Sequence, residues 1–536
     1  MISERLISVV GLLTVLGIAF AFSNNKKAIK PRTVLWGIGL QLLLALMILK
    51  QGVVSFVGFF VLVALILVYV FEGDGRARGW SLPVVSGLVT VVTAGLCALF
   101  YALNGAGLAL PAVWITLVLG LLAAWKGQAF LGRVCVALFL TAGFGYCLAE
   151  NIDGKVLFGA LADKITAFLA LAIHGAKFLF GNLADNRYFF PGPDAGWPGF
   201  GFQFAFAVLP TIIFFSAFMS VMYYLGIIQK VIGAMAKFMN WTLQTSGSET
   251  LSCTANIFVG QTEAPFLVKP FLKGMTPSEL HAVMVGGFAT IAGGVLAGYV
   301  QMGIDAGYLI GASVMAAPAA LVLSKLLYPE TEKSVTAGDV AMPEIPIADD
   351  VVDAAAAGAA DGMKLALNVA AMLIAFISLV AFADMILLWA DGIVDGKLLG
   401  GVQDAVTQEY AGFFPGSLRT FFGTLLAPVA FLLGVPWAEA AAVGNLLGVK
   451  VTLNEFVAYT QLSSAVAENS LSPRAVLIAT YALCGFANFS SVGIQIGGIS
   501  ALEPELRPTL ARIGFRALLG GTLASFMTAS IAGILV

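Results

Sequence analysis

The sequence predicts an all-α protein that crosses a membrane many times. Hydrophobic residues make up 60% of its 536 residues and charged residues only 11%, whereas soluble domains average about 25% charged residues. Repeated apolar runs approach the roughly 20 residues that a helix needs to cross the hydrocarbon. From residue 248 onward these runs become short and are interrupted by Gly, Pro, Asn and Glu. Such interruptions indicate irregular backbone that is covered by protein or lines a water-filled cavity.

The first 150 residues contain six candidate spans, and the charges of their loops support this number. Basic residues concentrate in the loops at 23–33, 72–80 and 125–133, while the alternate loops hold few. Because cytoplasmic loops carry the excess of Lys and Arg, we expect these three loops in the cytoplasm. The first run also resembles a signal peptide, but its basic flank favours a retained span with the N-terminus outside. The six spans are 6–22, 34–49, 53–71, 81–103, 108–124 and 134–149.

Two apolar segments that contain several charges are typical of helices lying in the membrane interface. They are 155–185 and 228–246, and they flank a predicted span at 202–225. Further along the chain, the acidic, Ala-rich segment 329–361 indicates an aqueous loop.

A polar hairpin followed by a broken span occurs twice in the second half of the chain. In the first copy, a re-entrant hairpin at 248–273 carries Glu263, and the span 280–302 is broken at 289–294. In the second copy, a hairpin at 436–465 carries Glu455, and the span 474–498 is broken at 485–491. A charged residue at membrane depth costs at least ~2.5 kcal/mol, so it usually has a function. Paired interrupted segments point to a transporter binding site. The other spans are 305–328, 363–391, 418–435 and 508–535.

The composition argues against several other classes of function. A net charge of −2 is too small to indicate a nucleic-acid partner. None of the five cysteines has a CxxC partner, and the two histidines lie far apart, so disulfides, zinc and a His-based metal site are not expected. A passive channel would need a polar stripe along several spans. A membrane-embedded hydrolase could use Glu263 and Glu455 as paired carboxylates, but no third group supports them. We therefore expect a transporter and not an enzyme.

Four segments resemble the concentrative nucleoside transporter family. They are SCTANIFVGQTEAP at 252–265, GGFATIAGGVLAGY at 286–299, NEFVAY at 454–459 and ALCGFANFSS at 482–491. The resemblance covers residues 1–50 and about 150–536. It implies a homotrimer whose subunits have a scaffold and a mobile transport part, the latter an inverted repeat with two re-entrant helical hairpins and two broken transmembrane helices. Compact bacterial relatives have two spans before the interfacial helix, so we interpret the extra spans within 51–150 as a peripheral addition to the scaffold. A regulatory or partner surface is the alternative.

The resemblance and the apolar pattern together predict seven regions. They are scaffold spans at 1–50, the inserted spans at 51–150, interfacial helices with a scaffold span at 151–247, the first transport repeat at 248–328, the aqueous loop at 329–361, connecting scaffold spans at 362–435 and the second transport repeat at 436–536.

Recognition of a neutral nucleoside requires hydrogen-bonding groups that match the edge of its base. Gln261 can both donate and accept, and Thr262 and Glu263 extend this polar surface. The resemblance places all three at the tip of the first hairpin, facing the base, with Val295 packing against it. From the sequence pattern alone, Val295 is equally well explained as a packing residue.

The ribose hydroxyls need strong acceptors, and Glu455 supplies one. Asn488 and Ser491 lie three residues apart and so share one face of a helix. The resemblance joins both to Glu455 at the ribose and places Phe486 beside the base.

Uphill import needs a driving ion, and the first repeat offers oxygen ligands for sodium. Asn256 has a side-chain oxygen, Thr290 a hydroxyl, and Val259 and Ile291 have backbone carbonyls beside the breaks. In sodium-coupled relatives the matching positions form the ion site. A proton on Glu263 or Glu455 is the alternative, although Asn445 stands where relatives often have a glutamate. The sequence thus predicts a sodium–nucleoside symporter that spans the bacterial inner membrane many times and contacts lipid.

Overall fold

The computed structural model describes residues 2–77, 81–105, 107–185, 188, 203–336, 348–405 and 407–536. Regular secondary structure in these residues is helical, with one isolated β-bridge between Gln403 and Tyr410. Eleven helical segments among them are long and apolar enough to cross a membrane, which confirms the predicted all-α polytopic class. The chain divides into two compact units, residues 1–38 with 162–534 and residues 39–161.

Each of the six spans expected in the first 150 residues is a helix. In the smaller unit, α6 packs on α3, α4 and α5. A small core there contains Val63, Leu67 and Ala137, and the Phe144 ring meets Phe59 edge-on with 5.2 Å between ring centroids. The six helices are α1 (Ile2–Ala21), α2 (Pro31–Leu49), α3 (Val53–Ala77), α4 (Leu82–Asn104), α5 (Ala109–Trp125) and α6 (Ala129–Ala149).

The two segments expected in the membrane interface are also helical. Residues 154–184 form α7 (Gly154–Leu169), α8 (Ala172–Phe180) and the short η2 (Gly181–Ala184). Together they are also long and apolar enough to span, so their interfacial position stays a prediction. The second segment is α11 (Ile227–Leu243), which follows the span α10 (Phe204–Tyr224).

The first predicted repeat is a short hairpin followed by a helix broken in its middle. Its first arm is α12 (Gly247–Ala255), and its second arm consists of α13 (Ala264–Leu267) and η4 (Lys269–Gly274). The broken helix consists of α14 (Pro277–Ala289) and α15 (Gly293–Gln301), and α16 (Ala306–Leu327) follows. This broken helix lies in the interior of the larger unit. In its most apolar stretch 94% of the residues are buried, against 17% in α10.

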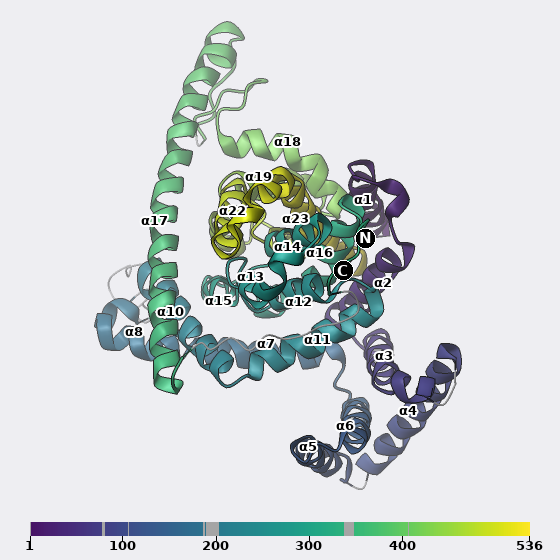
Figure 1. The fold of residues 1–536 in the computed structure, drawn as a ribbon. Helices are drawn as coiled ribbons and strands as arrows, with labels where there is room; N and C mark the ends of the chain where they lie inside the picture. The colour runs from purple at the N-terminus through teal and green to yellow at the C-terminus, as the bar shows by residue number, and fades with distance from the viewer. Residues whose placement is uncertain are drawn as a thin grey trace. The chain divides into compact units, whose positions relative to one another are not determined.

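The second predicted repeat has the same order of elements. The hairpin arms are α19 (Trp437–Thr452) and α20 (Glu455–Ala467), and the broken helix consists of α21 (Pro473–Leu483) and α22 (Phe489–Leu502). The long α23 (Arg507–Leu535) ends the chain. Helices of the two repeats, teal and yellow in Figure 1, lie side by side, with α16 against α21 and α14 against α22.

Capping residues explain why these half-helices begin where they do. Thr276 starts α14 with a capping box, in which Thr276 and Glu279 accept each other's backbone N–H groups, and at the start of α12 the N–H of Ser246 donates to Oε1 of Glu249 at 2.7 Å. Asn454 and Asn488 start α20 and α22 by accepting the N–H of the residue three positions on. We expected Asn488 and Ser491 to share one face of a helix. This is wrong in detail, because Asn488 precedes the first helical residue and accepts the N–H of Ser491 as the cap.

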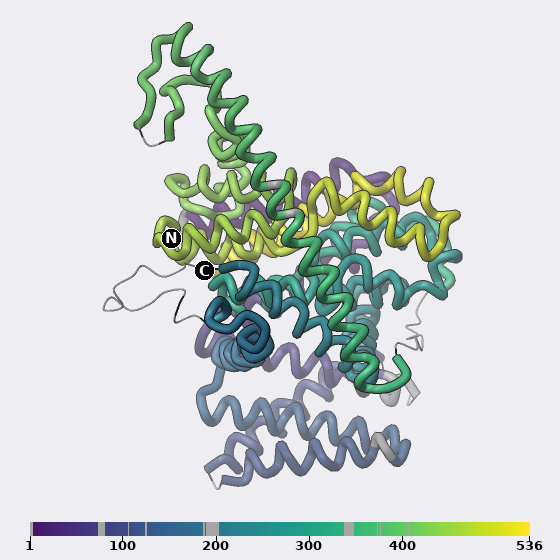
Figure 2. Tube along the Cα trace, turned by 90° about the vertical axis from the view of Figure 1, so that its left-hand side faces the viewer, coloured from purple at the N-terminus to yellow at the C-terminus, as the bar shows by residue number. Residues whose placement is uncertain are grey.

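One helix is much longer than the sequence predicts. The aqueous loop expected at 329–361 ends early, since α17 (Val351–Asp391) begins ten residues before residue 361, and residues 337–347 lie outside the described part. Asp350 caps the helix by accepting the N–H groups of Val352 and Asp353, so the acidic residues start a helix there. Figure 2 shows α17 as one continuous rod. The span α18 (Leu418–Leu433) then leads into α19 across a bend of 113°.

Candidate functional site

The two helix breaks meet each other in the middle of the larger unit. The backbone N–H of Phe486 donates to the carbonyl of Thr290 at 3.1 Å. Gly485, with a φ of +139°, packs against the carbonyls of Phe288 and Ala289, where a side chain would clash. Broken helices leave free N–H and C=O groups at their inner ends. The crossing therefore concentrates four such ends at one place, as ligand sites in transporters do.

A chain of hydrogen bonds connects the first hairpin tip to the second hairpin. Gln261 donates through Nε2 to Oγ of Ser491 at 3.1 Å, and the Ser491 N–H donates to Oδ1 of Asn488 at 2.9 Å. Nδ2 of Asn488 then donates to Oε2 of Glu455 at 3.2 Å. These four residues, all buried, come from three separate segments, and the sequence predicted all four as substrate ligands.

Each carboxylate oxygen of Glu455 accepts a hydrogen bond from the protein. Asn488 donates to Oε2, and the hydroxyl of Tyr299 in α15 donates to Oε1 at 3.2 Å. The Tyr299 ring stacks on Tyr459 with 4.2 Å between centroids, which fixes its direction. An ionised carboxylate has about four lone-pair positions, so it can still accept from a ligand. Tyr299 was not identified from the sequence, although it ends a quoted motif.

Gln495 fixes the orientation of the Gln261 amide. Its Nε2 donates to Oε1 of Gln261 at 3.0 Å and to the backbone carbonyl of Met284 at 3.2 Å. Gln261 must therefore present its N–H₂ toward Ser491. Sequence reasoning missed Gln495, but a signal existed, because it lies four residues after Ser491 and so shares its helical face.

The other predicted substrate ligands lie near this chain without joining it. Thr262 is half-buried and approaches Gly498 of α22. The Glu263 side chain is exposed and folds back over Gly260. Val295 is buried in the first turn of α15, and Phe486 is half-buried at the second break. In the described residues no hydrogen bond links these four side chains to Glu455, so their roles stay predictions.

The residues predicted to bind sodium lie at the first break. Asn256 is buried, and its Nδ2 donates to the carbonyl of Ser252 at 2.9 Å, while its Oδ1 has no hydrogen-bond partner among the described residues. The Thr290 hydroxyl donates to the carbonyl of Gly286 at 2.8 Å, which leaves its lone pairs available. The carbonyl of Phe258 accepts from the N–H of Gly293 at 3.2 Å, which ties the segment of Val259 to that of Ile291. An unpartnered buried oxygen beside a hydroxyl and freed carbonyls fits a cation.

Asn445 lies apart from these residues. Its Nδ2 donates to Oε1 of Gln461 at 3.0 Å, across the two arms of the second hairpin.

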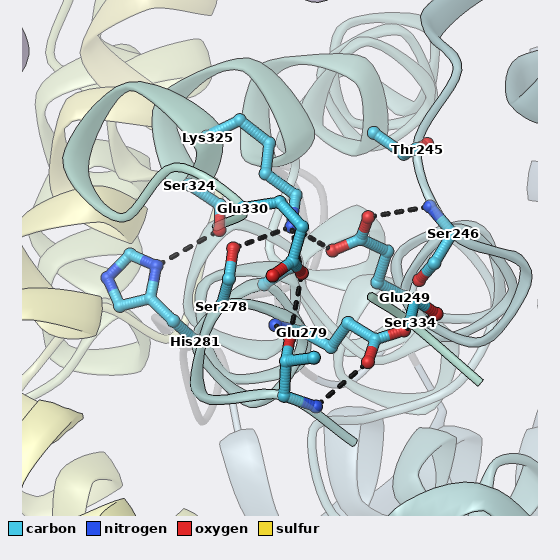
Figure 3. A network of polar contacts seen from close by, with 12 residues as sticks. Thr245, Ser246, Glu249, Ser278, Glu279, His281, Ser324, Lys325, Glu330 and Ser334 are labelled. Atoms are coloured by element: carbon cyan, nitrogen blue, oxygen red, sulfur yellow. Dashed lines mark hydrogen bonds and ion pairs between the residues drawn. The ribbon is translucent and has the colours of Figure 1, made fainter. Parts of the chain in front are cut away.

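A buried ionic cluster holds the opposite end of the first hairpin (Figure 3). Nζ of Lys325, near the end of α16, lies 2.5 Å from Oε2 of Glu249 in α12 and donates to Oγ of Ser278 in α14 at 2.8 Å. Glu279 accepts from Ser334 and Ser248 at 2.6 and 3.1 Å. The cluster joins α12, α14 and α16, so the hairpin tip is carried on a rigid base.

Models of one protein family match three stretches of the chain. The model described as the N-terminus of Na+ dependent nucleoside transporters matches residues 10–73, and that described as their C-terminus matches residues 308–533. A model described as nucleoside recognition matches residues 205–306, which include Gln261 and the first break. The N-terminal match extends to residue 73 and so includes the first part of the predicted insertion at 51–150.

Named relatives include bacterial and mammalian transporters. An uncharacterized transporter of Haemophilus influenzae is 43% identical over 408 residues, covering 75% of this chain and 90% of the relative. Sodium/nucleoside cotransporter 1 of Mus musculus is 44% identical over 413 residues, covering 73% of this chain. The match spans only 58% of the mouse protein, so the chain corresponds to little more than half of that relative.

Solved structures of CNTnw share this fold. The inward-facing, substrate-bound state is 32% identical with a TM-score of 0.70, covering 99% of this chain and 98% of the other. A doubly substituted outward-facing form also has a TM-score of 0.70 and 32% identity, covering 99% and 97%.

Proposed function

Because the chain belongs to the family of Na+-dependent nucleoside transporters, we propose that it imports nucleosides with sodium by alternating access. The observation that carries the proposal is the hydrogen-bond chain from Gln261 to Glu455. It joins groups from both repeats, so a ligand bound there contacts both. A bound ligand can thus determine how the repeats are arranged.

The base would bind at the first hairpin tip. Since Gln495 occupies Oε1 of Gln261 and Ser491 accepts one N–H, one amide N–H of Gln261 remains for the substrate. That donor matches a ring nitrogen or carbonyl of a base. Thr262 and Glu263 add a hydroxyl and a carboxylate beside it. Both purine and pyrimidine nucleosides offer such acceptors, so both are proposed substrates.

The ribose would bind at Glu455. The carboxylate accepts from the ribose hydroxyls, and charge-assisted hydrogen bonds of this kind are worth about 1.5–3 kcal/mol each. Asn488 and Tyr299 hold the carboxylate in place before the ligand arrives.

Sodium would bind between Asn256, Val259, Thr290 and Ile291, and Oδ1 of Asn256 supports this position because it lacks a partner. An ion there connects the first hairpin to the first break and fixes the tip that carries Gln261. Ion and nucleoside then strengthen each other's binding by equal factors. One sodium ion moving down a potential of about 100 mV supplies ~2.3 kcal/mol.

We further propose a homotrimer in the bacterial inner membrane. Its support is α17, whose 41 residues measure about 60 Å, twice the ~30 Å hydrocarbon. This helix exposes apolar side chains such as Ile374, Phe382 and Trp389. Native mass spectrometry of the purified protein tests it, and a monomer in mild detergent would exclude the trimer.

The test of transport is radiolabelled uridine and adenosine uptake into proteoliposomes, with sodium and proton gradients imposed separately. We expect accumulation driven by an inward sodium gradient. Uptake driven by a proton gradient alone would show that the coupling ion is a proton and not sodium. Equilibration without accumulation would indicate a channel, cleaved nucleoside inside would indicate a hydrolase, and uptake of neither compound would exclude nucleosides.

Glu455→Gln is the matched variant for that assay. The substitution keeps the volume of the side chain but removes its charge and replaces one acceptor oxygen with an NH₂ donor. We expect weaker uridine binding with unchanged folding, whereas normal affinity would remove Glu455 from the site.

A further inference from the structure

A buried lysine, Lys450, lies in the last turn of the first arm of the second hairpin and contacts the second helix break. We propose that the ammonium group of Lys450 is a tethered cation for the second helix break, which leaves one mobile sodium ion per nucleoside. This inference rests on the proposed function, since it deepens the ion coupling described above.

Lys450 has no exposed surface, and its ammonium group contacts oxygen atoms at the second break. Nζ donates to the carbonyl of Ala482 at 2.8 Å and to Oγ of Ser525 at 3.2 Å. Ser525 in turn donates to the carbonyl of Cys484 at 2.8 Å. Lys450 thereby satisfies, directly and through one hydroxyl, two carbonyls that the end of α21 leaves free.

In each repeat the group lies near the carboxyl end of the first hairpin arm. Asn256 is the C-cap of the first arm α12, which packs on α14, and a side chain at Gly286 of α14 would lie 3.4 Å from its amide. Lys450 lies in the last turn of the first arm α19, which packs on α21. In each repeat the carboxyl ends of two half-helices converge. Such ends carry partial negative charge, so each pair favours a cation.

The chemistry of the two places differs in one respect. At the first break, the contacts of Asn256 and Thr290 in the described residues are with backbone carbonyls, and Oδ1 of Asn256 has no partner. At the second break, the ammonium group of Lys450, three residues before the C-cap Leu453 of α19, already makes its own hydrogen bonds. The first repeat therefore takes a mobile ion, while the second carries its own.

Lys450 acts on the substrate as a positioning residue. The two carbonyls belong to Ala482 and Cys484, four to six residues before Asn488, and Asn488 donates to Glu455. Without a positive charge, the two helix ends repel each other and the segment that carries Asn488 loses its position.

Two variants separate a charge role from a packing role. Lys450→Ala leaves a space lined by oxygen atoms, and Lys450→Met fills it with an apolar chain. We expect both to bind uridine at least tenfold more weakly. Methylammonium ions should restore binding and raise the thermal stability of Lys450→Ala but not of Lys450→Met. Tetramethylammonium, which has no N–H donors, should restore neither, and Lys364→Ala, a change at an exposed lysine, should behave like the wild type.

Normal uridine binding by Lys450→Met, or failure of methylammonium to affect Lys450→Ala, would overturn the proposal. The melting-temperature comparison needs no transport, so it decides the role of Lys450 even if uridine proves to be the wrong substrate. If neither variant folds, the number of charges that the wild-type protein moves with each uridine tests the proposal. We expect one charge to move per uridine in proteoliposomes, and two charges per uridine would show a second mobile ion.

Discussion

Replacing Tyr299 with phenylalanine tests whether Glu455 is held in place for the ribose. The change removes only the hydroxyl that donates to Oε1 of Glu455 at 3.2 Å. The ring remains, so its contacts with Tyr459 and Phe456, with 4.2 and 5.1 Å between ring centroids, are retained. The perturbation therefore affects one hydrogen bond to a buried carboxylate and little packing.

The expected loss of affinity follows from that bond. A hydrogen bond to a charged group contributes about 1.5–3 kcal/mol, and each 1.4 kcal/mol is about tenfold in a dissociation constant. Because Asn488 still holds Oε2, part of the positioning survives. We expect uridine to bind roughly tenfold more weakly, with a smaller effect on a nucleoside that lacks ribose hydroxyls.

The assay is isothermal titration of uridine and of 2′,3′-dideoxyuridine into the purified protein at saturating sodium. Tyr481→Phe is the matched control, because Tyr481 is equally buried but its hydroxyl has no hydrogen-bond partner among the described residues. That variant should bind uridine normally. A Tyr299→Phe affinity within twofold of the wild type, or an equal loss for both ligands, would refute the reasoning.

Three further predictions concern the sodium ion, the nucleobase and the buried ionic cluster of the first hairpin. Asn256→Ala should raise the sodium concentration for half-maximal uptake about tenfold. The control is Asn445→Ala, which changes a buried Asn that contacts Gln461 and should leave the sodium dependence unchanged. An unaltered sodium response in Asn256→Ala would place the ion elsewhere. Gln495→Leu should weaken uridine binding about tenfold, because Gln261 loses the donor that orients its amide; titration calorimetry showing normal affinity would remove Gln495 from the site. Lys325→Met leaves Glu249 buried without its partner, which should cost about 3–5 kcal/mol and lower the melting temperature. Lys364→Met, at an exposed ion pair, should cost at most about 1 kcal/mol, and equal melting temperatures for the two variants would contradict the role of the cluster.

The sequence alone determined the class of fold and the position of most helices. Hydropathy and loop charge predicted six spans before residue 150. Each is a helix, and five are long and apolar enough to cross a membrane, whereas the apolar part of α5 is shorter. Small and polar residues marked both breaks, at 290–292 and 484–488, because they interrupt otherwise apolar runs. These features are local in the chain, and the transfer of side chains into lipid depends mainly on local composition.

Only the tertiary structure decided which groups form the site and how each is oriented. The bonds from Gln261 to Ser491 and from Tyr299 to Glu455 join residues 230 and 156 positions apart, which no local pattern encodes. The contact between the ammonium group of Lys450 and the carbonyl of Ala482, 32 residues away, has no signal in the local sequence. A side chain's role in a dry interior depends on the partners that compensate its burial. Those partners come from distant segments, so the sequence identified polar residues and the fold determined what each one binds.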